Sequence, residues 1–387
     1  MKTNLLFIRR AALHAAAALA LITTGFSKEA VVDPKPITDN ESLVQLAILL
    51  DTSNSMDGLI EQAKTQLWKI VNEFNGAKQG DKTPVVQVAL YEYGNNNLSA
   101  GTNWIRQVLP FTRDLDKVSD ELFKLTTNGG SEYCGAVIRD AMDKLDWDRS
   151  SKTYKAIFVA GNEPFTQGPI PADDSCKSAI SKGVIVNTIH CGAESAGIDG
   201  GWRRGAHIAE GKFLTIDQDK AVVHIEAPQD KEITRLSIEI NKTYIGYGSA
   251  APAAAANQVA QDSNAARYKS AGAEVQRAVT KSSANYSNTS WDLVDACKKG
   301  TVKLESIPAK DLPAELKSLK PEELKAVIDK KAAEREKIQA EIRTLNEERQ
   351  KFVAAKQKES GKADTLDTAI SKVVREQASA KAQITFK

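Results

Sequence analysis

The sequence is poor in cysteine, histidine and aromatic residues, and neither sign of charge predominates. Its 387 residues include four cysteines and four histidines, and aromatic residues make up 6% of the chain. Four cysteines in a chain of this length do not make a disulfide scaffold. The 52 basic and 50 acidic residues leave a formal charge of +2. Because nucleic-acid binding needs a basic surface, we expect no nucleic-acid partner.

What the chain does contain is an ordinary globular composition. Hydrophobic residues make up 42% and charged residues 26%, which excludes a wholly disordered chain and a collagen. The length is enough for two domains, or for one domain with a long appendage.

The first 27 residues have the pattern of a secretory signal peptide. An apolar run over 11–21 follows a basic start, and small residues occupy positions −3 and −1 of a cleavage site after residue 27. The run is too short for a spanning helix, and no later segment has 18 consecutive apolar residues. We therefore expect no transmembrane segment after cleavage, and a periplasmic or secreted protein. Cleavage removes Lys2, Arg9 and Arg10, which leaves 49 basic against 50 acidic residues.

Residues 28–40 are predicted to be a linker, and residues 41–248 a sheet domain. The run at 43–50 is almost continuously apolar, which is typical of a strand covered on both faces. Strand and helix patterns then alternate about six times, which predicts an α/β fold: a three-layer, doubly wound, mostly parallel sheet. Strands are expected at 43–50, 85–93, 104–111, 156–160, 184–190, 213–216 and 221–225, and helices at 59–74, 114–125, 133–146, 173–182 and 228–242.

The most informative motif is Asp51-Thr-Ser53-Asn-Ser55, at the end of the first predicted strand. Ligands of open parallel sheets bind beyond the carboxyl ends of the strands. One carboxylate and two hydroxyls suit a hard cation such as Mg²⁺ or Mn²⁺. In the simpler interpretation, one serine caps the following helix and Asp51 stabilises its positive end.

In this segment the sequence resembles the von Willebrand factor type A domain, over residues 43 to about 242. The resemblance rests on LAILLDTSNSM (46–56), TTNGGSEYCGAVI (126–138), IFVAGNEPF (157–165) and VIVNTIHCG (184–192). It implies the family's metal-ion-dependent adhesion site, in which Asp-x-Ser-x-Ser is joined by a threonine and an aspartate from two further loops. Ser131 is the counterpart of that threonine, with Thr126 and Thr127 as second choices.

The third loop departs from the family pattern. The usual Thr-Asp-Gly is replaced by Ala160-Gly-Asn-Glu163, so the expected aspartate falls on Gly161 or Asn162. Asn162 offers an amide oxygen, and Glu163 either reaches the ion or faces solvent. The missing negative charge should weaken the site.

Several segments also resemble a narrower group of exported bacterial proteins with such a domain. These are NGGSEYCG (128–135), AGNEPFTQGP (160–169), NTIHCG (187–192) and SWDLVDA (290–296). This resemblance implies a compartment and no substrate.

Cysteines in an exported protein meet an oxidising environment. Cys134, Cys176 and Cys191 should lie near the carboxyl edge of the predicted sheet, and a disulfide between two of them is expected, with the pair left open. Cys297 is either free or bonded to the third. The alternative is ordinary buried thiols.

The C-terminal third has a different composition. Residues 249–300 are expected to form a helical connector that packs on the sheet domain. Residues 301–387 are highly charged, and their apolar residues recur at helical spacing over 321–358 and 364–382. This pattern predicts a helical hairpin or coiled-coil-like extension that could bind a partner or self-associate. The alternative is a long solvated helix with i,i+4 charge pairs; Lys331, Arg335, Arg349 and Lys356 interrupt the apolar seam.

The leading hypothesis is an exported, non-enzymatic binding module. A divalent ion held by Asp51, Ser53, Ser55 and Ser131, with Asn162 on the third loop, would accept an acidic group of a protein partner, as the resemblance implies. The alternative is a metal-free scaffold of the cell envelope that interacts through its C-terminal helices. A hydrolase ranks last, because the sequence presents no nucleophile–base pair.

Overall fold

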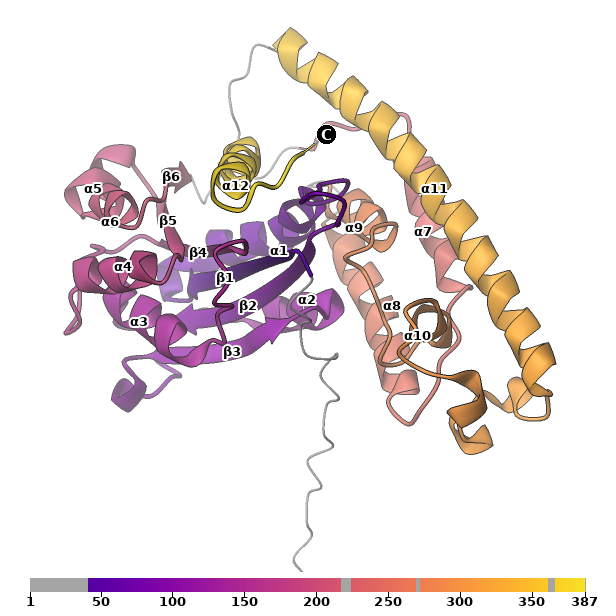
Figure 1. Cartoon of the computed structure of the whole chain (residues 1–387). Coiled ribbons are helices and arrows are strands. Elements are labelled where there is room, and N and C mark those ends of the chain that lie inside the picture. The colour runs from indigo at the N-terminus through magenta and orange to yellow at the C-terminus, as the bar shows by residue number, and fades with distance from the viewer. Residues whose placement is uncertain (1–40, 217–223, 269–271, 361–365, 387) are drawn as a thin grey trace, which may run out of the picture. The chain divides into compact units, whose positions relative to one another are not determined.

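A six-stranded sheet forms the centre of the first half of the chain in the computed structural model (Figure 1). The strands lie in the order β3-β2-β1-β4-β5-β6, and only the pair of β2 with β3 is antiparallel. The fold class predicted from the sequence is therefore confirmed. The strands are β1 (Leu43–Asp51), β2 (Val85–Tyr93), β3 (Ile105–Thr112), β4 (Tyr154–Gly161), β5 (Ile185–Cys191) and β6 (Phe213–Ile216).

The structure describes residues 41–216, 224–268, 272–360 and 366–386. The expected signal peptide (1–27) and linker (28–40) lie outside these ranges, as does most of the strand expected at 221–225. Among the described residues, no helix is both long enough and apolar enough to span a membrane.

Helices cover both faces of the sheet. Alternate residues of β1 point to opposite faces, so its apolar run contributes to a core on each side. Leu46 and Leu50 belong to the core beneath α1 and α2, whereas Ala47 and Leu49 belong to the core beneath α3, α4 and α6. These helices are α1 (Asp57–Asn72), α2 (Leu115–Lys124), α3 (Cys134–Lys144), α4 (Ala172–Ser181), α5 (Glu194–Asp199) and α6 (Trp202–Ile208), with short 3₁₀ turns η1 (Asn54–Met56) and η2 (Ala100–Thr102).

The last helix of the chain, α12 (Leu366–Ala382), packs on the α1 face of this sheet beside β4 and β6 (Figure 1). Val374 and Ala378 are fully buried in the same core as Leu46 and Leu50. Gln377 accepts a hydrogen bond from Tyr154 Oη (2.8 Å) and donates one to Asn187 Oδ1 (2.7 Å). A helix from the end of the chain thus completes the helical layer on the α1 face of the sheet, over β4 and β6.

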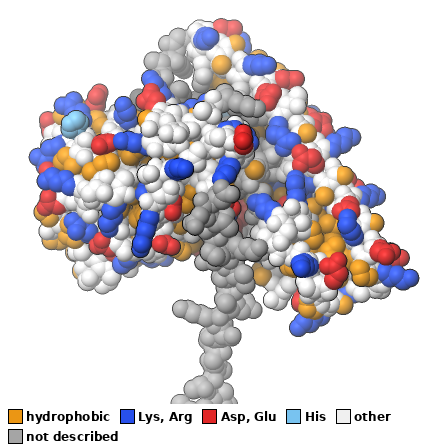
Figure 2. All heavy atoms as spheres, in the orientation of Figure 1, with side chains coloured by type: hydrophobic (Ala, Val, Ile, Leu, Met, Phe, Trp, Pro, Cys, Tyr) orange, Lys and Arg blue, Asp and Glu red, His pale blue; other side chains and the backbone are white. Residues whose placement is uncertain are grey.

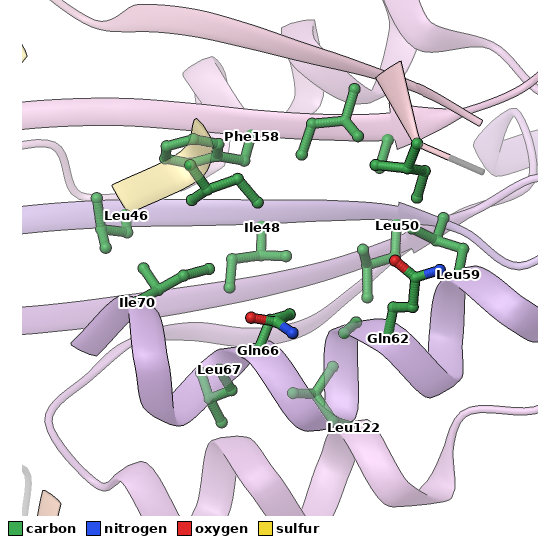
Figure 3. Close-up of a pocket in the computed structure, with 15 residues that line it drawn as sticks. Leu46, Ile48, Leu50, Leu59, Gln62, Gln66, Leu67, Ile70, Leu122 and Phe158 are labelled. Atoms are coloured by element: carbon green, nitrogen blue, oxygen red, sulfur yellow. The ribbon is translucent and has the colours of Figure 1, made fainter. Parts of the chain in front are cut away.

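A cavity of about 60 Å³ lies between the sheet, α1 and α12 (Figure 3). Leu46, Ile48 and Leu50 of β1 and Phe158 of β4 face it from the sheet, and Ile370 closes it from α12. Its lining is apolar apart from Gln62 and Gln66 of α1. The cavity is therefore a packing gap in the core, and it contributes no polar group to the carboxyl edge of the sheet.

The remaining helices form a second layer that runs from α7 to α11 (Figure 1). They are α7 (Asp230–Asn241), α8 (Ala251–Arg267), α9 (Ala273–Lys281), α10 (Leu293–Lys298) and α11 (Pro321–Ser360), with 3₁₀ turns η4 (Leu304–Ser306), η5 (Ala309–Asp311) and η6 (Ala314–Leu316). Here α8 and α9 contact α2 and α1 respectively, and α11 contacts α7, α9 and α10.

The charged residues in the predicted seam of α11 fall into two kinds. Arg335 and Arg349 are buried, and they pair with Asp292 (2.6 Å) and Asp230 (2.7 Å) of the neighbouring helical layer. Lys331 and Lys356 pair with glutamates three residues further along α11. The helices α11 and α12 therefore pack on different parts of the chain. The cause is that the seam arginines find their carboxylates on α7 and just before α10.

Candidate metal centre

The predicted metal-binding motif lies at the carboxyl edge of the sheet. Asp51 is the last residue of β1 and is fully buried, and Ser53 and Ser55 lie in the turn that leads through η1 into α1. The backbone N–H of Ser53 donates to Asp51 Oδ1 (2.8 Å), and the two serine hydroxyls are 3.3 Å apart. The intervening Thr52 points away and donates to Glu92 on β2. The alternation of the motif therefore brings its three oxygen-bearing side chains together.

The second loop joins α2 to α3 and is held against the first. The N–H of Asn128 donates to the Thr52 carbonyl (3.0 Å), and Asn95 Nδ2 donates to the Thr126 carbonyl (2.8 Å). The Thr127 hydroxyl donates to Asp57 of α1, so it is already engaged. Ser131 is half-buried, and its hydroxyl makes no hydrogen bond within the described ranges. Of the loop hydroxyls considered from the sequence, those of the half-buried Ser131 and the exposed Thr126 are left available among the described residues.

The third loop follows β4 and contains Gly161, Asn162 and Glu163. Asn162 Nδ2 donates to Ser55 Oγ (3.0 Å), which connects this loop to the first motif. A Cβ on Gly161 would lie 2.5 Å from Tyr93 Oη and 3.0 Å from Asp51 Oδ2, so this position has no room for a side chain. Asn162 is therefore the third-loop residue that reaches the motif, whereas Glu163 is exposed.

Glu132, which the sequence analysis did not single out, also belongs to this edge. It is 7% exposed, and its side chain hydrogen-bonds that of Ser53. A Cβ on Gly94 would lie 2.6 Å from Glu132 Cγ and 2.9 Å from Asp51 Oδ1, so the two acidic side chains approach each other across this glycine. Its position directly after Ser131 was the available signal, but burial of an acid cannot be read from one position.

The electrostatics of this edge are unusual for two carboxylates. Burial, and next the charge of Glu132, raise the pKa of Asp51 to about 8. Burial, and next the charge of Glu163, raise the pKa of Glu132 to about 7. No ion pair of Asp51 or Glu132 occurs among the described residues. The arrangement therefore disfavours two negative charges unless a positive charge is supplied.

The cysteines expected near this edge are there, but they are free thiols. Cys134, Cys176 and Cys191 are buried, and Cys297 is partly exposed. No disulfide joins any of the four in this structure. The thiol of Cys134 lies 3.5 Å from Tyr93 Oη, which itself donates to the carbonyl of Ala160 (2.9 Å). These side chains pack beneath the site and do not form a bridge across it.

Comparison with known families agrees with this geometry. Residues 45–197 match the family model described as the von Willebrand factor type A domain. This segment is a von Willebrand factor type A domain. The matched range holds all three loops of the site, together with most of β1 and the whole of β2 to β5.

Solved structures of other proteins are similar to less than half of the chain. The conserved hypothetical protein BatB from Bacteroides thetaiotaomicron is 19% identical, with 45% of this chain and 90% of that chain covered and a TM-score of 0.35. The von Willebrand factor domain of the type V pili tip protein Mfa5 from Porphyromonas gingivalis is 12% identical, with 46% and 90% covered and a TM-score of 0.34. Among curated proteins, none matches this sequence.

Domains of this family commonly hold a divalent metal, and the oxygen atoms of this site fit one. Three buried oxygens have no hydrogen-bond partner: Asp51 Oδ2, Asn162 Oδ1 and Glu132 Oε2. A hard divalent ion prefers carboxylate, amide and hydroxyl oxygens of this kind. In the described part of the chain, no three His, Cys, Asp or Glu side chains form a metal-binding group. A metal ion held at this edge would therefore need serine and asparagine oxygens as well as carboxylates.

Proposed function

We propose that this protein is an exported binding module whose von Willebrand factor type A domain holds a divalent cation and, through it, an acidic group of a protein partner. The observation that carries the proposal is the buried, unpartnered Oδ2 of Asp51 at the carboxyl end of β1. A buried carboxylate without a partner is costly, and Mg²⁺ or Mn²⁺ at this point would satisfy it. Ser53, Ser55, Ser131 and Asn162 would supply the remaining protein oxygens.

The chemistry of such a site is recognition. The cation would present an open coordination position at this edge of the sheet, and a carboxylate is the side-chain group that best completes an oxygen shell. Loops at the carboxyl ends of parallel strands are where ligands of this fold class bind. The protein residues would hold the ion and orient it, while the partner supplies the last ligand.

Titration calorimetry with MnCl₂ and MgCl₂ tests the cation first. The wild-type protein should bind one ion, and Asp51→Asn should lose at least about tenfold in affinity, because outer-shell changes alone cost 10–100-fold at metal sites. Asp174→Asn, on the exposed surface of α4, is the matched control and should bind as the wild type does. Absence of binding to the wild-type protein would refute the metal-dependent function.

The acidic ligand is tested on the Mn²⁺-loaded protein. Acetate should displace water from the bound ion and lower the water-proton relaxation enhancement, whereas acetamide at the same concentration should not. An equal effect of the two probes would contradict recognition of a carboxylate.

The second candidate, a metal-free envelope scaffold that uses its C-terminal helices, is less well supported. The seam of α11 that would bind a partner or a second copy is buried in the same chain, with Ile328 and Ile342 at 3% and 0% exposure. A partner of α11 would have to use its charged outer face. On the face shown in Figure 2, basic and acidic side chains are interspersed, with no large area of one sign.

A further inference from the structure

The buried carboxylates of this protein follow a consistent pattern with one exception. Five acidic side chains in the described ranges are less than a tenth exposed: Asp51, Glu92, Asp116, Glu132 and Asp292. Three of them pair with an arginine at 2.5–2.6 Å, namely Glu92 with Arg106, Asp116 with Arg277 and Asp292 with Arg335. The other two, Asp51 and Glu132, have no basic partner there. They are also the two that approach each other across Gly94.

An uncompensated pair of buried carboxylates is the least favourable of these arrangements. Each lone carboxylate loses hydration without gaining a counter-charge, and two together also repel. One oxygen of each side chain, Asp51 Oδ2 and Glu132 Oε2, has no hydrogen-bond donor. A single divalent ion would neutralise both charges and satisfy both oxygens, as an arginine does elsewhere in the chain.

We propose that Glu132 is the second carboxylate ligand of the cation site and replaces the negative charge that the third loop lacks at Asn162. This inference rests on the proposed function, and it adds a ligand to the pattern of Asp-x-Ser-x-Ser, threonine and aspartate described above. The ligand set then contains two carboxylates, from β1 and from the loop before α3, and the ion is neutralised within the protein. The second loop thus supplies the charge, and the third loop supplies an amide.

The experiment compares Mn²⁺ affinity by calorimetry in four full-length variants. Glu132→Gln keeps the shape of the side chain and removes its charge, so it should weaken binding at least about tenfold. Glu163→Gln removes an exposed charge on the third loop and should change the affinity no more than about threefold. Asn162→Asp restores the usual third-loop carboxylate. Asn162→Asp should raise Mn²⁺ affinity at least about tenfold in the Glu132→Gln background. It should raise the affinity much less in the wild-type background, because only Glu132→Gln lacks a carboxylate charge.

A thermal-unfolding readout separates a ligand from a merely structural residue. Without metal, Glu132→Gln should unfold at a higher temperature than the wild type, because it removes a buried unpaired charge. With saturating Mn²⁺, the wild type should gain more in Tm than the variant does. A purely structural glutamate would lower Tm in both conditions when replaced.

The outcomes distinguish this inference from the function on which it rests. If the wild type binds Mn²⁺ and Glu132→Gln binds equally well, Glu132 is not a ligand and only this inference fails. If the wild type binds no divalent ion, both fail. If Asn162→Asp gains equally in both backgrounds, the charge replacement is refuted even when Glu132→Gln is weak.

Discussion

Replacement of Arg277 by methionine should destabilise the protein by about 3–5 kcal/mol, because it leaves a buried carboxylate without its cation. Arg277 lies on α9 and is 1% exposed. Its Nη1 is 2.6 Å from Asp116 Oδ1 on α2, and its Nε is 2.6 Å from Asp262 Oδ1 on α8. Its guanidinium also stands 4.8 Å from the ring of Trp68 on α1. One side chain therefore connects the helical layer to the sheet domain.

The magnitude follows from what each carboxylate keeps. Asp262 retains Lys281 at 3.0 Å, so it stays paired. Among the described residues, Asp116 retains only a hydrogen bond from Tyr286 Oη (2.6 Å) to its side chain, and it is 5% exposed. The loss should therefore come mainly from Asp116, and it is a large part of the 5–15 kcal/mol that stabilises a typical protein.

Urea unfolding followed by circular dichroism measures the change as a fall in the midpoint at unchanged slope. The double variant Arg277→Met with Asp116→Asn should recover at least about 1 kcal/mol, because a neutral amide no longer needs a cation. Arg235→Met breaks the exposed pair with Glu232 on α7 and should cost less than about 1 kcal/mol. A loss of less than about 1 kcal/mol in Arg277→Met, or no recovery in the double variant, would refute the reasoning.

Three further predictions concern the site edge, the thiols and α12. Gly161→Ala should lower Mn²⁺ affinity about tenfold, because the new Cβ would overlap the Tyr93 hydroxyl, whereas Gly101→Ala, which meets only a side chain at 3.4 Å, should not. Ile384→Ala should lower the free energy of unfolding in urea by about 2–5 kcal/mol. Ile238→Ala, at a position 60% exposed, should lower it by less than about 0.5 kcal/mol. Equal losses would contradict the packing of the segment after α12 on the sheet. Thiol labelling of the native protein should modify Cys297 first, because it is partly exposed whereas the other three thiols are buried and shielded from the reagent. Labelling of fewer than four thiols after unfolding would show a disulfide.

The sheet and its first motif were predictable because their signals are local. The apolar run of β1 and the three- and four-residue spacing of α1 each lie within one element, and the structure places both within two residues of expectation. Asp51, Ser53 and Ser55 lie within five residues, so their spacing alone brought them together. Asn162 could be assigned because a family pattern supplied the register of the third loop.

The burial of Glu132 and the packing of α12 could not be predicted, because their environments depend on residues that are distant in the sequence. Glu132 approaches Asp51 across Gly94, a residue 38 positions earlier that has no side chain to separate them. The apolar face of α12 was visible in Ile370 and Val373, but nothing in that face specifies the sheet as its partner. The polar contact that does so, Gln377 with Asn187, spans 190 residues.

The arginines of the helical layer show how this chain neutralises its other buried carboxylates. Arg277 and Arg335 reach carboxylates 161 and 43 residues earlier in the chain, so the fold brings cations to buried acids from distant elements. Such an arginine neutralises a carboxylate permanently and fills the space beside it. At Asp51 and Glu132, which have no basic partner among the described residues, we propose that a cation from solution meets the same charge requirement. A cation bound there can keep a coordination position for a partner, which an arginine cannot offer, and this difference is the physical argument for a binding role at this edge.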